Sequence, residues 1–288
     1  MSTALHPAPA RQRGALGLVV TGQFSVQFGA AVAALLFGRI GPGGAVTLRL
    51  AIAAILLLAV FRPRLRGRTR ADRITVLGFG LALAAMNVCF YEAIDRIPLG
   101  SAVTLEVLGP LTLSVITGRT RLGLVWAGLA VCGVALLGRD GFTGLTPAGA
   151  AFALLAGGFW ACYIVLAHRT GAAFDGLDGL ALAMGISALA ALPLGIATAG
   201  ATLLDPVSLG LGAAVALLSS LVPYSLELLA LRRIPASTFA VVMSLSPAVA
   251  ALAGAVVLGQ PVTPVAAAAI ALVVIANAGA VLQGARGA

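Results

Sequence analysis

The stretch YEAIDRIPLGSAVTLEVLGPL, from Tyr91 to Leu111, places two glutamates in a part of the chain that is otherwise strongly apolar. The whole chain of 288 residues is 60% hydrophobic and only 9% charged, with a mean hydropathy of +1.09. A soluble domain has about 25% charged residues, which it needs to cover its surface. The composition therefore predicts a protein that crosses a membrane several times, and it raises the question of why Glu92 and Glu106 lie within it.

Ten apolar segments have the length of roughly 20 residues that a membrane-spanning helix requires. Short connections rich in Gly, Pro and Asp separate them. The first segment is longer than the apolar region of about 7–15 residues in a cleaved signal peptide, and many similar segments follow it. We therefore expect an all-α membrane protein with ten transmembrane helices, at residues 15–36, 43–61, 74–94, 98–117, 121–138, 147–167, 177–199, 208–231, 235–258 and 262–283.

The arginines predict the orientation of these spans. With the N-terminus inside, fourteen arginines fall in inner loops and tails, three fall in outer loops, and Arg49 lies within the second span. Cytoplasmic loops carry an excess of basic residues, so both termini are expected in the cytoplasm of a bacterium, with the chain in its plasma (inner) membrane. Because the arginines are spread between apolar runs, the net charge of +9 does not indicate a nucleic-acid partner.

The chain also repeats itself at a shift of 137 residues. DRIPLGSAVTLEVLGP (95–110) aligns with RRIPASTFAVVMSLSP (232–247), and GQFSVQF (22–28) resembles GGFWACY (157–163) at a slightly different shift. Each half has five spans, an odd number, so the two halves are expected to have opposite orientations, as in the inverted repeats of many secondary transporters. The expected divisions are an N-terminal tail (1–14), a first repeat (15–138), an outer linker (139–146), a second repeat (147–283) and a C-terminal tail (284–288).

Two segments resemble a known family. NVCFYEAIDRIPLGSAVTLEVLGPL (87–111) and SSLVPYSLELLALRRIPASTFAVVMSLSPAVAAL (219–252) resemble the EamA-type drug/metabolite transporters, and within them the threonine/homoserine exporter subfamily. The resemblance covers nearly the whole chain. It implies efflux of small amino acids or related metabolites across the bacterial plasma membrane.

Four ionisable side chains fall within or near the ends of the spans: Arg49, Glu92, Glu106 and Glu227. Such groups are costly in a membrane and usually face protein or a water-filled cavity. At about 1.5 Å per residue, Glu106 lies close to the middle of the membrane, and Arg49 lies within reach of it. Glu92 and Glu227 lie near span ends, where a long side chain can reach the interface. We therefore expect Glu106 and Arg49 to form the centre of the site, with Glu92 and Glu227 either as further coupling groups or as structural residues that reach the interface.

Proline distinguishes Glu106 further. Pro110 has no N–H to donate to the Glu106 carbonyl, so a carboxylate and a free carbonyl are expected to lie together on a kinked helix, where they could hold an ammonium group. At the shift of 137, Pro247 repeats Pro110, whereas Met243 takes the place of Glu106. The duplicated prolines predict shared gating mechanics, and the single charge predicts one binding site. The alternative is that Arg49 and Glu106 form an ion pair that joins two helices.

Aromatic and amide residues are expected to complete the binding cavity. The candidates are Gln23, Gln27, Asn87, Tyr91, Trp160, Tyr163, Tyr224 and Asn277. No metal site or cofactor is expected, because the chain has two histidines, its three cysteines fall in apolar segments, and a Walker A loop would need a lysine.

The leading functional prediction is a secondary exporter that works by alternating access, with protons as the candidate coupling ion. Its expected partners are a small-molecule substrate and the lipid bilayer. A channel or facilitator for small polar solutes is the second reading, although no ring of charges or filter loop is visible. A membrane-embedded enzyme is the third, and the spans contain neither paired carboxylates nor a HExxH motif to support it.

Overall fold

The computed structural model describes residues 9–63, 67–118, 121–139, 145–223, 226, 230 and 236–287, and the regular elements in these ranges are all helical. A 3-10 helix, η1 (Gly200–Leu204), and a π-helical turn, η2 (Leu217–Leu221), flank α9. The α-helices are α1 (Pro9–Leu35), α2 (Phe37–Phe61), α3 (Arg70–Arg96), α4 (Leu99–Glu106), α5 (Leu108–Gly118), α6 (Arg121–Arg139), α7 (Pro147–Ala173), α8 (Asp178–Ala199), α9 (Pro206–Ala216), α11 (Ala236–Met243), α12 (Ser246–Leu258) and α13 (Pro264–Gly287).

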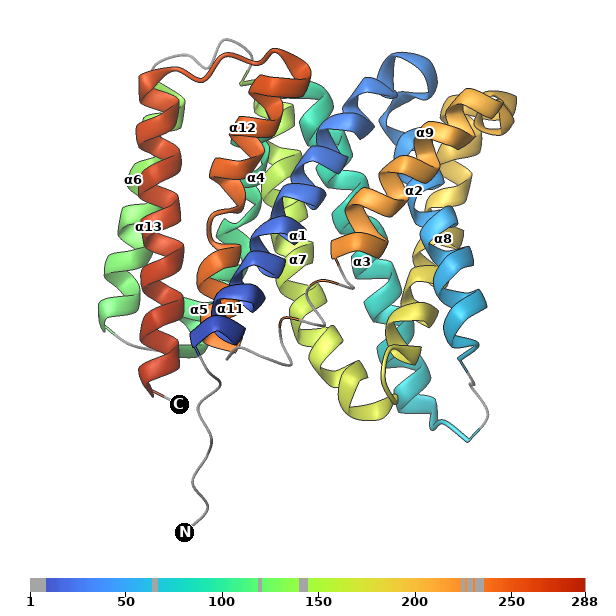
Figure 1. Ribbon diagram of the computed structural model, residues 1–288, viewed down its shortest axis with the longest axis horizontal. Coiled ribbons are helices and arrows are strands. Elements are labelled where there is room, and N and C mark those ends of the chain that lie inside the picture. Colours follow the sequence, from blue (N-terminus) through green and yellow to red (C-terminus); the bar gives the residue numbers. More distant parts are fainter. Residues whose placement is uncertain are drawn as a thin grey trace.

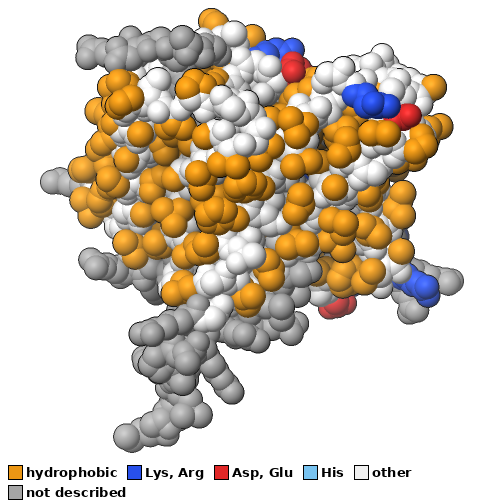
Figure 2. Space-filling model, turned by 45° about the horizontal axis from the view of Figure 1, so that its top comes forward, with side chains coloured by type: hydrophobic (Ala, Val, Ile, Leu, Met, Phe, Trp, Pro, Cys, Tyr) orange, Lys and Arg blue, Asp and Glu red, His pale blue; other side chains and the backbone are white. Residues whose placement is uncertain are grey.

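The all-α membrane class is confirmed. In the described part of the chain, 8 helical segments are long and apolar enough to cross a membrane. Two shorter apolar helices, Leu122–Leu137 and Pro206–Leu221, lie where the fifth and eighth spans are predicted. The face seen in Figure 2 is largely apolar, with charged side chains gathered near its two ends, as a bilayer requires.

Local sequence explains where the helices begin. Thr69 and Asp72 form a reciprocal capping box at the start of α3, and the Thr146 hydroxyl accepts a hydrogen bond from Gly149 N at the start of α7. Gly41, directly before Pro42, has a φ of 66°. This non-helical conformation separates the first turn of α2 from the rest of the helix. Polar end turns also extend the helices beyond the apolar runs, so α1 begins at Pro9 rather than near residue 15.

The fourth and ninth predicted spans are interrupted, as the prolines predict. The helix of the fourth span breaks at Val107, between α4 and α5, three residues before Pro110. The helix of the ninth breaks at the turn Ser244–Leu245, between α11 and α12, just before Pro247. Val107 and Ser244 are 137 positions apart in the sequence.

The helices pack into one bundle that carries the start of α1 and the end of α13 on the same side, which we call the terminus side (Figure 1). α2 packs against α8, α3 packs against α7 and α8, and α6 packs against α13. Glycines allow these close contacts: a Cβ added at Gly195 would collide with Thr47, and one added at Gly80 would collide with Ile186. On the opposite side of the bundle, α4 packs against α12.

Candidate functional site

A cavity of about 300 Å³ lies between the two interrupted spans and helices α1, α2, α3, α7 and η2. Its wall is mixed, with charged, amide and hydroxyl groups among apolar and aromatic ones. The residues that line it are Gln23, Val26, Gln27, Ala30, Arg49, Met86, Asn87, Phe90, Val103, Glu106, Trp160, Tyr163, Ser219, Pro223, Met243 and Ser246.

Glu106 is the acidic group of this cavity. It is the last residue of α4, directly before the break at Val107, so the interruption of the helix fixes its position in the wall. Within the described residues, its carboxylate takes part in no hydrogen bond or ion pair, Arg49 included, although Arg49 lines the same cavity. The carboxylate is therefore available to a ligand.

Arg49 provides the positive charge. Its Nη2 donates to the Ser219 carbonyl at 3.4 Å, and its guanidinium lies over the Tyr91 ring, 5.7 Å from the centroid. Its Nε is buried and has no hydrogen-bond partner among the described residues. Two neighbours thus orient the guanidinium and leave part of its donor set for a carboxylate, the group whose geometry matches the fork of an arginine.

Proline removes one helical partner of the Ser219 carbonyl, which accepts a hydrogen bond from Arg49. Pro223 follows Ser219 by four residues and cannot donate the helical hydrogen bond to that carbonyl. The backbone around it forms η2, and π-helical turns often occur at functional sites. Sequence reasoning did not include Ser219, although the spacing from Ser219 to Pro223 is the same as that from Glu106 to Pro110.

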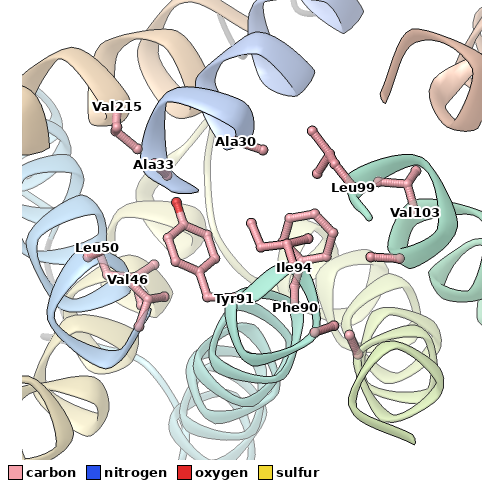
Figure 3. Packing of buried hydrophobic residues seen from close by; sticks show 14 of the residues in the cluster. Ala30, Ala33, Val46, Leu50, Phe90, Tyr91, Ile94, Leu99, Val103 and Val215 are labelled. Atoms are coloured by element: carbon pink, nitrogen blue, oxygen red, sulfur yellow. The ribbon is translucent and has the colours of Figure 1, made fainter. Parts of the chain in front are cut away.

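The structure places Tyr91 behind Arg49 and not in the cavity wall. Its side chain is fully buried, and its ring contacts Phe37 and Phe90. Figure 3 shows the ring between α3 and α2, with the hydroxyl directed toward α1. Tyr91 is therefore positioned to orient the guanidinium of Arg49 by a cation–π contact, rather than to touch a ligand.

Gln23 and Gln27 lie one turn apart on α1 and both line the cavity, but their amides differ. The Gln23 amide is committed: its Oε1 accepts from Ser246 Oγ at 2.6 Å and its Nε2 donates to Met243 Sδ. It thereby ties α1 to the break between α11 and α12. The Gln27 Oε1, in contrast, is buried without a partner among the described residues.

Asn87, Trp160 and Tyr163 also line the cavity, as expected. The Asn87 amide donates to the Leu83 carbonyl at 2.8 Å, which fixes its orientation on α3. Trp160 and Tyr163 are three residues apart on α7 and share one face, and the Tyr163 ring packs on Phe79 at 5.1 Å between centroids. These three groups give the site amide and aromatic surface.

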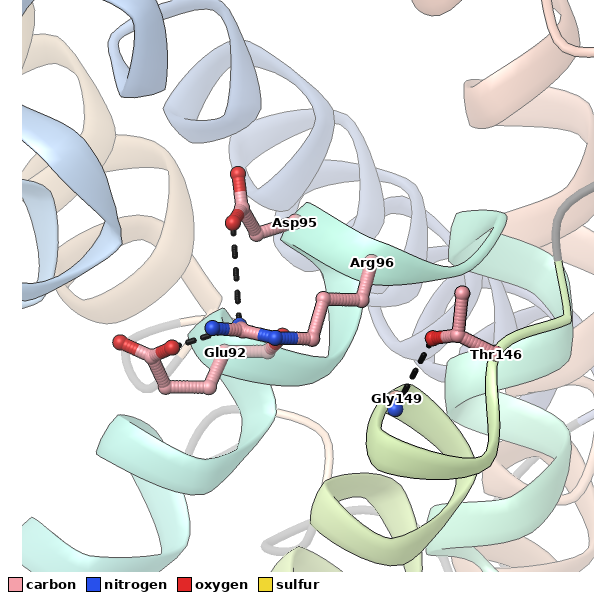
Figure 4. A network of polar contacts seen from close by, with 5 residues as sticks. All are labelled: Glu92, Asp95, Arg96, Thr146 and Gly149. Carbon is pink, nitrogen blue, oxygen red and sulfur yellow. Dashed lines mark hydrogen bonds and ion pairs between the residues drawn. The ribbon is translucent and has the colours of Figure 1, made fainter.

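The other candidates lie elsewhere. Glu92 pairs with Arg96 one turn later on α3 at 2.6 Å, and Figure 4 shows the Arg96 guanidinium between Glu92 and Asp95 at the end of that helix. Asn277 is on α13 and does not line the cavity. Tyr224 and Glu227 lie outside the described residues.

The carbonyl freed by Pro110 does not join the carboxylate as a second ligand group, contrary to the expectation. The Glu106 carbonyl lies directly against Gly157 of α7, where an added Cβ would collide with it. Gly109 approaches the Gly157 backbone equally closely. The absence of two Cβ atoms lets the broken span press onto α7, and α7 then covers the carbonyl.

The cavity is closed on the side of the bundle opposite the chain termini. There Ala30, Phe90, Leu99 and Val103 are buried together (Figure 3). α4 and α12 meet beside them, because Gly100 lies against Ala251. On the terminus side, α5 and α11 have no comparable packing within the described residues.

A bundle of apolar helices that encloses a polar, ligand-sized cavity between two interrupted spans defines a membrane transporter, since membrane proteins tolerate unsatisfied polar groups only where they line a cavity. Residues 147–282 match the model of the EamA-like transporter family. The threonine/homoserine exporter RhtA of Escherichia coli (strain K12) is 38% identical over 268 residues, which are 92% of this chain and 90% of the relative. The chain belongs to the EamA-like transporter family.

Two further similarities agree with this assignment. The threonine/homoserine exporter RhtA of Salmonella typhimurium (strain LT2) is 39% identical over 261 residues, which are 90% of this chain and 88% of the relative. A solved crystal structure of a protein that is 20% identical shares the fold, with a TM-score of 0.59 over 94% of this chain and 98% of the other.

Proposed function

We propose that the protein exports small hydroxylated amino acids, threonine or homoserine among them, from the cytoplasm by alternating access. One observation carries the proposal: Glu106 and Arg49 face one cavity without pairing with each other. An amino acid offers an ammonium group to the carboxylate and a carboxylate to the guanidinium, so it neutralises both buried charges at once. The exporters that resemble the chain support the choice of cargo and direction.

The architecture of the proposal is ten spans in two inverted repeats, 15–138 and 147–283, with both termini in the cytoplasm. The interruptions at Val107 and Ser244, 137 positions apart, support related halves. Two ion pairs give further support: Arg68 pairs with Asp175 at 3.0 Å and Arg39 with Asp205 at 2.8 Å. Arg68 and Asp205 are 137 positions apart, and Arg39 and Asp175 are 136 apart, so the two pairs correspond with their charges exchanged. Reporter fusions should place the 138–147 loop outside the cytoplasm, and a cytoplasmic signal there would contradict the arrangement.

The gates are proposed to be the contacts between the two interrupted spans. Packing of α4 on α12, with no comparable packing of α5 on α11 in the described ranges, supports a conformation closed on the outer side. Release of cargo then requires α4 and α12 to separate while α5 and α11 approach, which exchanges the roles of the two halves.

Proton entry is the proposed driving force, with Glu106 as the group that accepts the proton when the cavity opens outward. A protonated carboxyl group no longer holds an ammonium, so protonation releases the cargo. Efflux from proteoliposomes should rise when the outer side is made more acidic than the lumen. Equal efflux with and without that gradient would favour the second candidate, a facilitator that uses the same residues.

Glu106→Gln tests the site directly, because glutamine keeps the shape and removes the charge. Loss of a buried charged partner costs about 2–5 kcal/mol, so threonine efflux is expected to fall by roughly 30-fold or more while the protein still reaches the membrane. The double variant Glu106→Gln with Arg49→Met removes both charges and should be folded but inactive. Near-normal efflux from it would show that the two residues serve only the fold. Turnover of a candidate substrate without transport would instead support an enzyme.

A further inference from the structure

The side-chain hydroxyl is what the proposed cargoes share beyond the amino acid backbone. Threonine carries it on the β carbon and homoserine on the γ carbon, and both have the same ammonium and carboxylate. If Glu106 and Arg49 hold those two charged groups, another group in the cavity must distinguish these molecules from apolar amino acids of the same size. This step rests on the proposed function.

Unpartnered polar atoms identify the candidates for that group. Within the described residues, buried polar side-chain atoms without a hydrogen-bond partner include Gln27 Oε1, Arg49 Nε and Ser219 Oγ, and all three residues line the cavity. Arg49 already has a carboxylate to hold in the proposed site. Ser219 Oγ lies against Gly29 of α1, where an added Cβ would collide with it, so its access to the cavity is narrow.

Gln27 has the chemistry and the reach for a hydroxyl. It is 6% exposed, and its Oε1 is buried without a hydrogen-bond partner within the described part of the chain. Its carbonyl oxygen can accept a hydrogen bond from a substrate hydroxyl, and its amino group can donate one back. Three rotatable bonds within the side chain allow the amide to follow a hydroxyl from the β to the γ position. Gln23, one turn earlier, lacks this freedom because Ser246 and Met243 hold its amide.

We propose that Gln27 recognises the side-chain hydroxyl of the cargo and sets the preference of the transporter for hydroxylated over apolar amino acids. An apolar cargo such as valine has the shape of threonine but leaves the Gln27 amide without a partner. A site built to bind a hydroxyl rejects such an analogue strongly, because its own buried polar group stays unpaired.

The test is competition against labelled threonine in proteoliposomes containing the full chain. The unlabelled competitors are threonine, valine, homoserine and norvaline, in which a methyl group replaces the homoserine hydroxyl. For the wild type, threonine should compete at least about tenfold better than valine, and homoserine better than norvaline by a similar factor. Gln27→Met keeps the length of the side chain and removes the amide, and it should reduce both preferences to within about threefold.

Two further variants sharpen the result. Gln23→Met should weaken threonine and valine alike and leave their ratio near that of the wild type, since its amide serves the α1–α12 contact. Gln27→Asn keeps an amide that is shorter by one methylene, and it should favour homoserine, whose hydroxyl extends further from the backbone. If Gln27→Met does not fold, the ratio measured with Gln27→Asn decides.

Each outcome has a distinct meaning. A wild type that transports threonine and valine equally well, or a Gln27→Met variant that retains the preference, overturns the role of Gln27 and leaves the proposed function standing. A wild type that transports no threonine overturns the proposed function, and the role of Gln27 falls with it.

Discussion

The two interrupted spans place the same break in the same cavity but use it differently. In the first, Glu106 has an unpaired carboxylate, and its freed carbonyl lies against Gly157. In the second, Met243 takes the position of Glu106, and its sulfur accepts a hydrogen bond from Gln23. Its freed carbonyl lies 2.5 Å from Ser246 Oγ, which can donate its single hydrogen either to this carbonyl or to Gln23 Oε1. Proline removes one hydrogen bond at each break, and the neighbours decide what the break becomes. The first is left open to a ligand, and the second is tied to α1.

The largest effect is expected where the first break presses on α7. Gly157→Ala would force a Cβ into the Glu106 backbone, and neither backbone can yield without moving a helix. Overpacking of this kind costs about 1–3 kcal/mol or more, so the yield of folded protein from the membrane should fall sharply. Gly158→Ala is the matched control, because nothing lies within 4 Å of the Cβ added there. Equal yields of the two variants would contradict the close contact at the first break.

A disulfide between α4 and α12, on the side opposite the termini, should stop transport without unfolding the protein. A Cβ added at Gly100 would lie 2.8 Å from the Ala251 Cβ, which is shorter than the separation of about 3.5–4.5 Å in a disulfide, so the bond can form once α4 and α12 move apart by about 1 Å. Oxidised Gly100→Cys with Ala251→Cys should therefore lock α4 onto α12, and efflux should return after reduction. The corresponding pair, 137 positions away, is Ser237 with Ser114. Cysteines at these two positions should crosslink more slowly than the pair at positions 100 and 251 in this conformation. Equally fast crosslinking of the two pairs would contradict a transport cycle in which one side is closed while the other is open.

A smaller effect is expected at the second break. Ser246→Ala removes the hydroxyl that lies within hydrogen-bond distance of both the Met243 carbonyl and Gln23 Oε1, so the acceptor that holds its single hydrogen loses its partner. Buried groups that lose a partner cost about 1–3 kcal/mol, so the melting temperature in detergent should fall by several degrees. Ser244→Ala is the control, since the Ser244 hydroxyl bonds only back to its own helix at Val241. Comparable melting temperatures for the two variants would mean that the second break is not held by Ser246.

The sequence predicted the class of fold, both interruptions and seven of the sixteen residues that line the cavity, for separable reasons. Composition decides the class, and proline decides the breaks. Helical spacing predicts which residues share a face, but it does not predict what covers that face. Asn87 and Tyr91 are one turn apart on α3, yet Asn87 lines the cavity and Tyr91 lies under Arg49. The sequence analysis did not include Ser219, because its side chain is small. The hydrogen bond from Arg49 to its carbonyl depends on how α2 packs near η2, which the sequence does not show.

The smallest expected effect concerns two ion pairs near helix ends, Arg39–Asp205 on the side opposite the termini and Arg68–Asp175 on the terminus side. They differ in one respect, because Asp205 also caps α9. The Ser208 N–H, followed by Arg39, lowers the pKa of Asp205 below its ordinary value. A lowered pKa stabilises the fold at neutral pH, and the stabilisation is lost only as the pH falls from the unfolded pKa of about 3.9 through the lower folded value.

Asp205→Asn keeps a good cap and removes the charge, whereas Asp205→Ala removes both. At neutral pH the melting temperature should therefore decrease slightly for Asp205→Asn and further for Asp205→Ala. The difference between wild type and Asp205→Asn should shrink as the pH falls below about 3.9 and disappear once the pH is below the lowered folded pKa, because the wild-type carboxylate is then protonated in the folded protein as well. Asp175→Asn removes a pair in which Asp175 is 95% exposed, so its effect should be smaller still. If Asp175→Asn lowers the melting temperature more than Asp205→Asn does, the helix cap at Asp205 is not what makes the two ion pairs different. The difference between the two sides of the bundle would then have another cause than the cap of α9.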